Sequence, residues 1–251
     1  MRSEKPFGNR PLADLVDCLP VRIRYAEGTG TDLVVSFSSI GQRRALMPDD
    51  EFTGTLLKAP DRHCLFVSDI TRSWLSSRNV CDAVRQAVAS VKASADIQRT
   101  STLGLSMGGF SALVAANLFD VDTAIAISPQ YSPLQTVMPT ETRWRYWRRR
   151  ITHSDFPTAE SGLRPGHSFV FHGLLDDTAH ASAFSQAAHL DHFVFPKATH
   201  ALGQHLKKSG GLHKLVTAAI NQDRRKVARL VRKNGGFWRQ SQEALLVADA
   251  A

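Results

Sequence analysis

The alternation of short apolar runs with helix-like patterns is the feature that most constrains the fold of this chain. Six segments have the length and the β-branched or aromatic composition of strands: 21–26, 33–37, 64–68, 123–127, 168–171 and 192–195. Apolar residues with helical spacing lie between them, at 80–93, 108–119, 181–190 and 212–221. Strands that alternate with helices predict a mostly parallel central sheet with helices on both faces.

The domain organisation follows from the same pattern. A chain of 251 residues with 43% apolar and 22% charged residues has the size and composition of one globular α/β unit. We expect a single domain over 1–222, interrupted at 130–166 by an insertion that is too long and too rich in proline for a simple connection. The remaining segment, 223–251, is basic and is expected to form a peripheral helix or to be partly disordered.

Cysteine usage and the absence of long apolar runs bear on the compartment. The three cysteines are widely spaced and form no CxxC pair, which disfavours both a disulfide framework and a zinc site. The amino-terminal residues contain no apolar core of a secretory signal, and no run approaches 18 apolar residues. These features predict a cytoplasmic protein without a transmembrane segment or a bound metal.

Two short segments carry the positive charge. Residues 143–150 hold five arginines and residues 224–233 hold six basic side chains, and neither segment contains Asp or Glu. Without these eleven side chains the net charge would change from +8 to −3. Such clusters are typical either of contacts with anions or of solvated helix faces. No recognised nucleic-acid motif accompanies them, which disfavours nucleic acid as a partner.

Residues 99–113, RTSTLGLSMGGFSAL, place a serine between glycines where a predicted strand gives way to a helix. A GxSxG motif alone is common, and a structural turn is the simplest alternative. The context favours a nucleophile, because a serine on a sharp strand-to-helix turn needs small neighbours, and Gly104, Gly108 and Gly109 provide them. Ser106 is therefore the predicted nucleophile.

A serine nucleophile needs a base, and the base needs an orienting carboxylate. HGLLDD follows the strand at 168–171, and PKATHAL follows the strand at 192–195. The carboxyl ends of parallel strands meet at one edge of the sheet, where ligands bind. His200 is therefore the predicted base, and either Asp176 or Asp177 supplies the carboxylate.

These three motifs resemble those of the α/β-hydrolase family of serine hydrolases, over about residues 21–221. GLSMGG resembles the nucleophile turn of the family, HGLLDD its acid loop and ATHAL its histidine loop. The resemblance implies the α/β-hydrolase fold with a lid-like insertion. It also favours Asp176 over Asp177, because the acid of the family usually stands three residues after the glycine of an HG pair. The FSS, VSD and SW elements are more loosely similar to serine hydrolases associated with bacterial polysaccharide biosynthesis or accessory secretion.

The family stabilises the developing oxyanion with two backbone N–H groups, and the resemblance assigns one of them to Met107. The second comes from the loop after the third strand. Many relatives have His-Gly in that loop, whereas this chain reads SFSSIG at 36–41, which argues against the lipase subtype with an HGGG loop. Ser39 is the predicted second donor, with Ile40 as the alternative.

Four other residues have positions that bear on the site. Trp144 and Trp147 are predicted substrate-binding residues whose rings stack on the substrate, the alternative being that they pack the insertion onto the core. Asp69 follows a strand end and is interpreted as a turn cap, and His172 is interpreted as structural.

The predicted function is hydrolysis of a carboxylic ester through an acyl-enzyme, with no metal or organic cofactor. The expected partner is a small-molecule or glycan ester, and the looser resemblance implies acyl groups on a glycan. The alternative is an acyltransferase that uses the same triad with a sugar hydroxyl as acceptor. A non-catalytic binding or assembly protein is disfavoured, because binding alone does not require Ser, His and Asp together.

Overall fold

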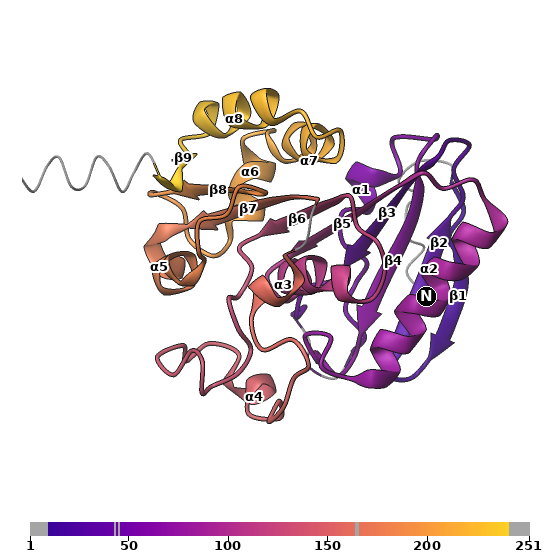
Figure 1. The fold of residues 1–251 in the computed structure, drawn as a ribbon, viewed down its shortest axis with the longest axis horizontal. Coiled ribbons are helices and arrows are strands. Elements are labelled where there is room, and N and C mark those ends of the chain that lie inside the picture. Colours follow the sequence, from indigo (N-terminus) through magenta and orange to yellow (C-terminus); the bar gives the residue numbers. More distant parts are fainter. Residues whose placement is uncertain (1–9, 43, 45, 164–165, 241–251) are drawn as a thin grey trace, which may run out of the picture.

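The computed structural model describes residues 10–42, 44, 46–163 and 166–240, and these residues form a nine-stranded mixed sheet flanked by helices (Figure 1). The sheet order is β1-β2-β4-β3-β5-β6-β7-β8-β9. The strands are β1 Ala13–Cys18, β2 Val21–Ala26, β3 Asp32–Phe37, β4 His63–Asp69, β5 Arg99–Leu105, β6 Thr123–Ile127, β7 His167–Gly173, β8 Leu190–Phe195 and β9 Phe237–Trp238.

Strands β4, β3, β5, β6, β7 and β8 are parallel to one another, and the pairings that involve β1, β2 or β9 are antiparallel. Every residue of β4, β6 and β8 is buried, which explains their nearly continuous apolar sequences. The predicted mostly parallel sheet of an α/β-hydrolase fold is confirmed.

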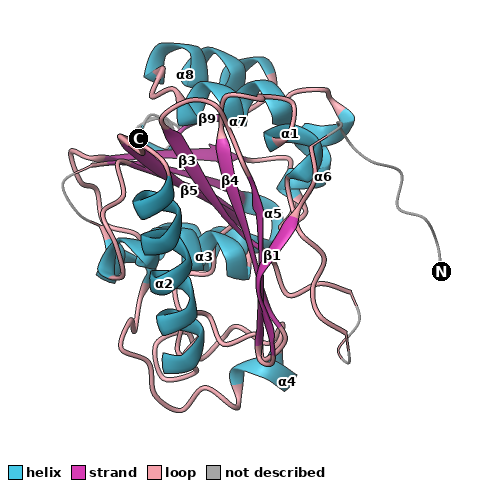
Figure 2. Ribbon diagram, turned by 90° about the vertical axis from the view of Figure 1, so that its right-hand side faces the viewer, coloured by secondary structure: helices cyan, strands magenta, loops and turns pink. Residues whose placement is uncertain are grey.

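Helices cover both faces of the sheet (Figure 2). They are α1 Thr53–Leu56, α2 Arg78–Ser94, α3 Met107–Val114, α4 Arg145–Arg148, α5 Leu174–Ala183, α6 Leu202–Lys208, α7 Leu212–Ile220 and α8 Arg224–Lys233, with short 3-10 turns η1 Ala115–Asn117 and η2 Ala159–Gly162. Residues of α2 and α3 belong to the apolar core on one face. Residues of α1, α6, α7 and α8 belong to the core on the other face.

The prediction of a helix at 181–190 is wrong. The helix in this region is α5, which begins directly after β7 and ends at Ala183. The apolar pattern that suggested a later helix comes from Phe184 and Ala187, which pack against the core from a loop, and from Leu190, which starts β8. The acid motif HGLLDD consequently lies on a strand end and a helix rather than on a loop.

The two segments that interrupt the strand–helix rhythm have different structures. Between β6 and β7, the described residues form only two short elements, α4 and η2, and α4 lies beyond the sheet, below α3 in Figure 1. At the carboxyl-terminal end, α8 packs against α7 and buries Val227 and Val231, and β9 joins the edge of the sheet. The end of the predicted segment 223–251 lies outside the described residues. None of the described helices is long and apolar enough to span a membrane.

Candidate active site

Ser106 lies on the tight turn between β5 and α3, with φ 57° and ψ −118°. A non-glycine residue in this region is strained and persists only where its surroundings enforce it. A Cβ atom on Gly104 would lie 2.0 Å from the carbonyl oxygen of Gly108, and one on Gly108 would lie 2.2 Å from the carbonyl oxygen of Phe37. The glycines of the motif therefore allow β5, α3 and the end of β3 to meet at the serine.

His200 connects this serine to a carboxylate. It follows β8 and precedes α6, and its Nε2 atom lies 2.9 Å from the Oγ of Ser106. Its Nδ1 atom lies 2.8 Å from Oδ2 and 3.0 Å from Oδ1 of Asp177, a fully buried side chain on α5. The structure thus brings together Ser106 and His200, which the sequence predicts as nucleophile and base.

The prediction that Asp176 orients the imidazole is wrong. Asp176 is an exposed side chain that accepts a hydrogen bond from the backbone N–H of His200, whereas the ring of His200 bonds Asp177. Both aspartates stand on the first turns of α5, where successive side chains point roughly 100° apart. The rotation of this helix directs Asp177 beneath the imidazole and Asp176 toward solvent.

Asp177 is ionised despite its burial. Burial by itself raises the pKa of this carboxyl, but the hydrogen bond and the charge of His200, together with His172 and Arg143, hold the pKa below its ordinary value. Arg143 contributes directly, because its Nη2 atom lies 2.8 Å from Oδ1 of Asp177. The insertion between β6 and β7 therefore reaches the carboxylate of the site.

Glu141 and His180 hold Arg143 in place. Glu141 accepts hydrogen bonds from Arg143, and its Oε2 atom lies 2.8 Å from Nε2 of His180. The backbone N–H of Tyr131 donates to Nδ1 of His180 at 3.0 Å, so Nε2 carries the proton that Glu141 accepts. Burial acts to raise the pKa of Glu141, but the hydrogen bonds from His180 and Arg143 outweigh it and lower the pKa well below its ordinary value.

Gln130 is a site residue that the sequence reasoning missed. Its Nε2 atom lies 2.8 Å from the Oγ of Ser106, and its Oε1 atom accepts from the indole N–H of Trp74 at 3.1 Å. An indole N–H only donates, so the orientation of this buried amide is determined: Nε2 faces the serine. Ser106 accepts from Gln130 and directs its own proton to His200. Gln130 follows the carboxyl end of β6, the same signal that predicted the acid.

The predicted oxyanion donors differ in their surroundings. Met107 is the first residue of α3 and is buried beside Ser106. The hydroxyl of Ser39 donates to Glu51, and burial raises the pKa of Glu51 to about 7 while hydrogen bonds from the hydroxyl and backbone of Ser39 oppose that rise. The role of Ser39 as an oxyanion donor stays a prediction. Its hydroxyl and its backbone N–H both bond Glu51.

The two predicted stacking residues also occupy different places. The ring of Trp144 packs against that of His200 with centroids 4.7 Å apart, and the guanidinium of Arg143 lies 4.5 Å from the centre of the indole. Trp147 is 8% exposed and carries the guanidinium of Arg72 over its ring at 4.8 Å. Trp144 therefore borders the site, whereas Trp147 packs the insertion onto the core. Substrate binding by either ring stays a prediction.

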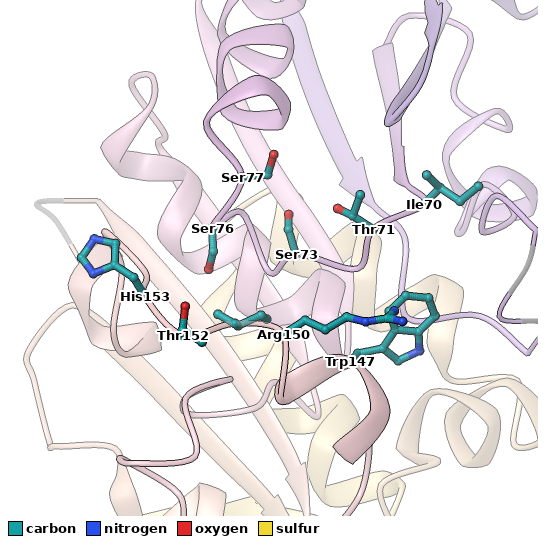
Figure 3. A pocket seen from close by; sticks show the side chains of 10 residues that line it. Ile70, Thr71, Ser73, Ser76, Ser77, Trp147, Arg150, Thr152 and His153 are labelled. Atoms are coloured by element: carbon teal, nitrogen blue, oxygen red, sulfur yellow. The ribbon is translucent and has the colours of Figure 1, made fainter.

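Two cavities are lined by segments that neighbour these residues. One has a volume of about 630 Å³ and is named the hydroxyl cavity; it lies between the segment that follows β4 and the insertion (Figure 3). Its lining includes Thr71, Ser73, Ser76, Ser77, Trp147 and Arg150. The other has a volume of about 540 Å³ and is named the lysine cavity. Its lining includes Glu51, Phe52, Lys58, Leu105, Lys207 and His213. Among the described residues, no group of His, Cys, Asp and Glu side chains is arranged to hold a metal ion.

Comparisons with known proteins support the fold. No family model and no curated protein matches the sequence. An esterase of Pyrococcus furiosus has a similar structure, with a TM-score of 0.59 and 12% identity over 86% of this chain and 91% of that one. The capsule O-acetyltransferase of Neisseria meningitidis serogroup A has a TM-score of 0.55 and 13% identity, over 84% of this chain and 97% of that one. An esterase of Pyrobaculum calidifontis has a TM-score of 0.53 and 13% identity, over 86% of this chain and 88% of that one. The chain has the fold of these α/β-hydrolase enzymes.

Proposed function

We propose that this protein is a serine hydrolase that cleaves a carboxylic ester through an acyl-enzyme. The continuous hydrogen-bonded series from Gln130 through Ser106 and His200 to Asp177 is the observation that carries the proposal. A binding protein has no need for a strained serine whose proton is directed at an imidazole, itself held by a buried carboxylate.

In the proposed reaction, the Oγ of Ser106 attacks the ester carbonyl while its proton passes to Nε2 of His200. Asp177 accepts from Nδ1–H and stabilises the imidazolium that forms. The imidazolium then gives the proton to the leaving alkoxide, and the alcohol departs. Water attacks the acyl-enzyme by the same route in reverse, which releases the acid and regenerates the serine hydroxyl.

The oxyanion of the tetrahedral intermediate needs two donors in this scheme. The backbone N–H of Met107 is one, as in other enzymes with this turn. We assign the second to the side-chain amide of Gln130, because Trp74 fixes its NH2 group beside the Oγ of Ser106, and the second N–H of that group is left to face the carbonyl oxygen of the substrate. This assignment fits the engagement of Ser39 with Glu51.

The hydroxyl cavity supports a polyhydroxylated alcohol, such as a glycan, as the part of the substrate that carries the ester. The hydroxyl groups of Thr71 and Ser73 donate to Asp69 at 2.5 and 2.6 Å, so their oxygen atoms are free to accept from substrate hydroxyls. This cavity adjoins the site, because Ser73 precedes Trp74, which bonds Gln130.

Transfer of the acyl group to a sugar hydroxyl is the second candidate. The same cavity would hold an acceptor hydroxyl as well as a leaving alcohol, and one similar structure is an O-acetyltransferase. The two reactions differ only in whether water or the acceptor attacks the acyl-enzyme.

Labelling with a fluorophosphonate probe tests the proposal. We expect the wild type to be labelled, Ser106→Ala to be unlabelled, and His200→Ala and Asp177→Asn to react far more slowly. Asp176→Asn is the matched control and is expected to label at nearly the wild-type rate. An unlabelled wild type would refute the catalytic proposal. Turnover of short-chain aryl esters with and without sugar acceptors then separates hydrolysis from transfer, because only a transferase makes acylated sugar.

A further inference from the structure

We infer that the lysine cavity binds a carboxylate or phosphate group that the ester substrate carries at the end of a short apolar arm. The inference rests on the proposed function and specifies which class of ester the site takes. It concerns a part of the molecule that neither the triad nor the hydroxyl cavity uses.

The lysine cavity is next to the proposed nucleophile. Leu105 lines it and directly precedes Ser106, and Gly203, which also lines it, stands three residues after His200. Glu51 lines the cavity too and bonds Ser39 in the loop after β3. The cavity is therefore bordered by the nucleophile turn, by the helix that follows the histidine, and by a residue bonded to the loop after β3.

The charge that faces the cavity is positive. Lys58 and Lys207 are exposed side chains on its rim, and neither pairs with a carboxylate among the residues that the structure describes. Asp50 also lines the cavity, but its carboxylate is bound by Arg22 and Arg24. The lysines are therefore the charges left to bind a ligand.

His213 and Glu51, which also line the cavity, have shifted pKa values. The pKa of His213 is lowered first by burial and then by the positive charges of Lys58, Arg62 and Lys214. Burial raises the pKa of Glu51 to about 7, and its Oε2 atom is buried without a hydrogen-bond partner. A carboxyl group that protonates this readily opposes a bound anion less than an ordinary glutamate does.

The lining of the cavity also includes apolar side chains. Phe52, Leu105 and Leu212 are half-buried there, and Gly203 leaves room beside the Leu105 side chain. Apolar side chains and two lysines that line the same cavity fit an arm of methylene or aromatic groups that ends in an anion. A neutral arm of the same length would gain the apolar contact only.

The test compares pairs of esters that differ by one carboxylate group. The acyl-borne pair is para-nitrophenyl hemiglutarate against para-nitrophenyl butyrate. The alcohol-borne pair is para-carboxyphenyl acetate against phenyl acetate. The variant is Lys58→Ala with Lys207→Ala, and the matched control is Lys208→Ala, a lysine of α6 outside the cavity lining.

We expect the ratio of the anionic to the neutral KM to rise roughly five- to tenfold in the double variant for one of the two pairs, since each exposed charge contact is worth only a modest factor. Which pair responds shows whether the acyl group or the alcohol carries the anion. The ratio in Lys208→Ala should equal that of the wild type, and added salt should reduce the wild-type preference. An unchanged ratio in both pairs, or an equal change in Lys208→Ala, would overturn the inference.

Failure of the proposed function would be visible separately. If the wild type neither turns over these esters nor takes a fluorophosphonate label, the hydrolase proposal fails and the cavity is judged by binding alone. Calorimetry with monomethyl glutarate should then show binding to the wild type and to Lys208→Ala, with a several-fold weaker affinity for the double variant. Equal affinity in all three proteins, or no binding to the wild type, would refute the cavity as an anion site.

Discussion

The two basic segments are alike in sequence and different in structure. Arginines of 143–150 reach the carboxylate of the candidate site and the interior of the insertion. The basic side chains of 224–233 belong to α8, where only Val227 and Val231 are buried. The same density of positive charge thus orders a site in one region and covers a helix surface in the other. The surroundings of a charge, and not its number in the sequence, decide what it does.

Replacement of Arg148 is expected to have the largest effect. Its buried guanidinium donates to the carbonyl oxygens of Pro133 at 2.9 Å and Met138 at 2.9 Å, and also to those of Leu134 and Glu141. Arg148→Met leaves these acceptors without their donor. We expect the free energy of unfolding, measured with urea, to fall by about 2–4 kcal/mol.

Arg229→Met on α8 is the matched control for Arg148→Met, because Arg229 carries the same side chain on the opposite segment. A change within about 0.5 kcal/mol is expected there. Equal losses in the two variants would erase the difference between the segments.

Arg143→Met is expected to impair catalysis more than stability. The variant removes a positive charge 2.8 Å from Asp177 and frees Trp144 from its cation contact. We expect kcat/KM to fall by about tenfold, the cost of a displaced carboxylate–imidazole pair of about 1.4 kcal/mol. Loss of this positive charge also lets the pKa of the Asp177 carboxyl rise, so the acidic limb of the kcat/KM profile should move to higher pH. A profile that stays in place would contradict this role, and Arg149→Met is the control.

The acidic partner of the first segment gives a pH dependence of stability. The pKa of Glu141 in the folded protein lies below its ordinary value of 4.5. A carboxyl with a lowered pKa contributes stability that is complete above the unfolded pKa and is lost as the pH falls below it. The Tm of the wild type should therefore fall steeply from about pH 4.5 downward. Glu141→Gln should have a lower Tm at neutral pH and a shallower acidic decline, whereas parallel curves would contradict the assignment.

The smallest effect is expected in the second segment. Arg224 binds Asp191 through two contacts of 2.6 and 2.7 Å, but its own side chain is 55% exposed. Arg224→Met should lower the free energy of unfolding by less than about 1 kcal/mol, and salt should reduce the difference. Arg225→Met, on the same helix turn without such a pair among the described contacts, is the control. A loss as large as that of Arg148→Met would show that α8 is also an essential part of the fold.

Local sequence determined the parts of the molecule whose physics is local. Period and apolar content placed six strands of the sheet, because a strand that is buried on both faces, such as β6, is mostly apolar. The glycines around Ser106 were predictable from the sequence for a steric reason, since no larger residue fits at Gly104 or Gly108. His200 was predictable because it follows a strand end at the same edge of the sheet as the turn that carries Ser106.

Tertiary structure alone decided which groups complete the site. The choice of Asp177 over Asp176 depends on the rotation of α5 beneath the imidazole, a property of helix packing that adjacent identical residues cannot encode. Gln130 and Arg143 are ordinary residues of the insertion in sequence, and they matter because the chain brings them to Ser106 and Asp177 from 24 and 34 positions away. Contacts between distant segments form only when the whole sheet is assembled, and they gave each charge and amide its role.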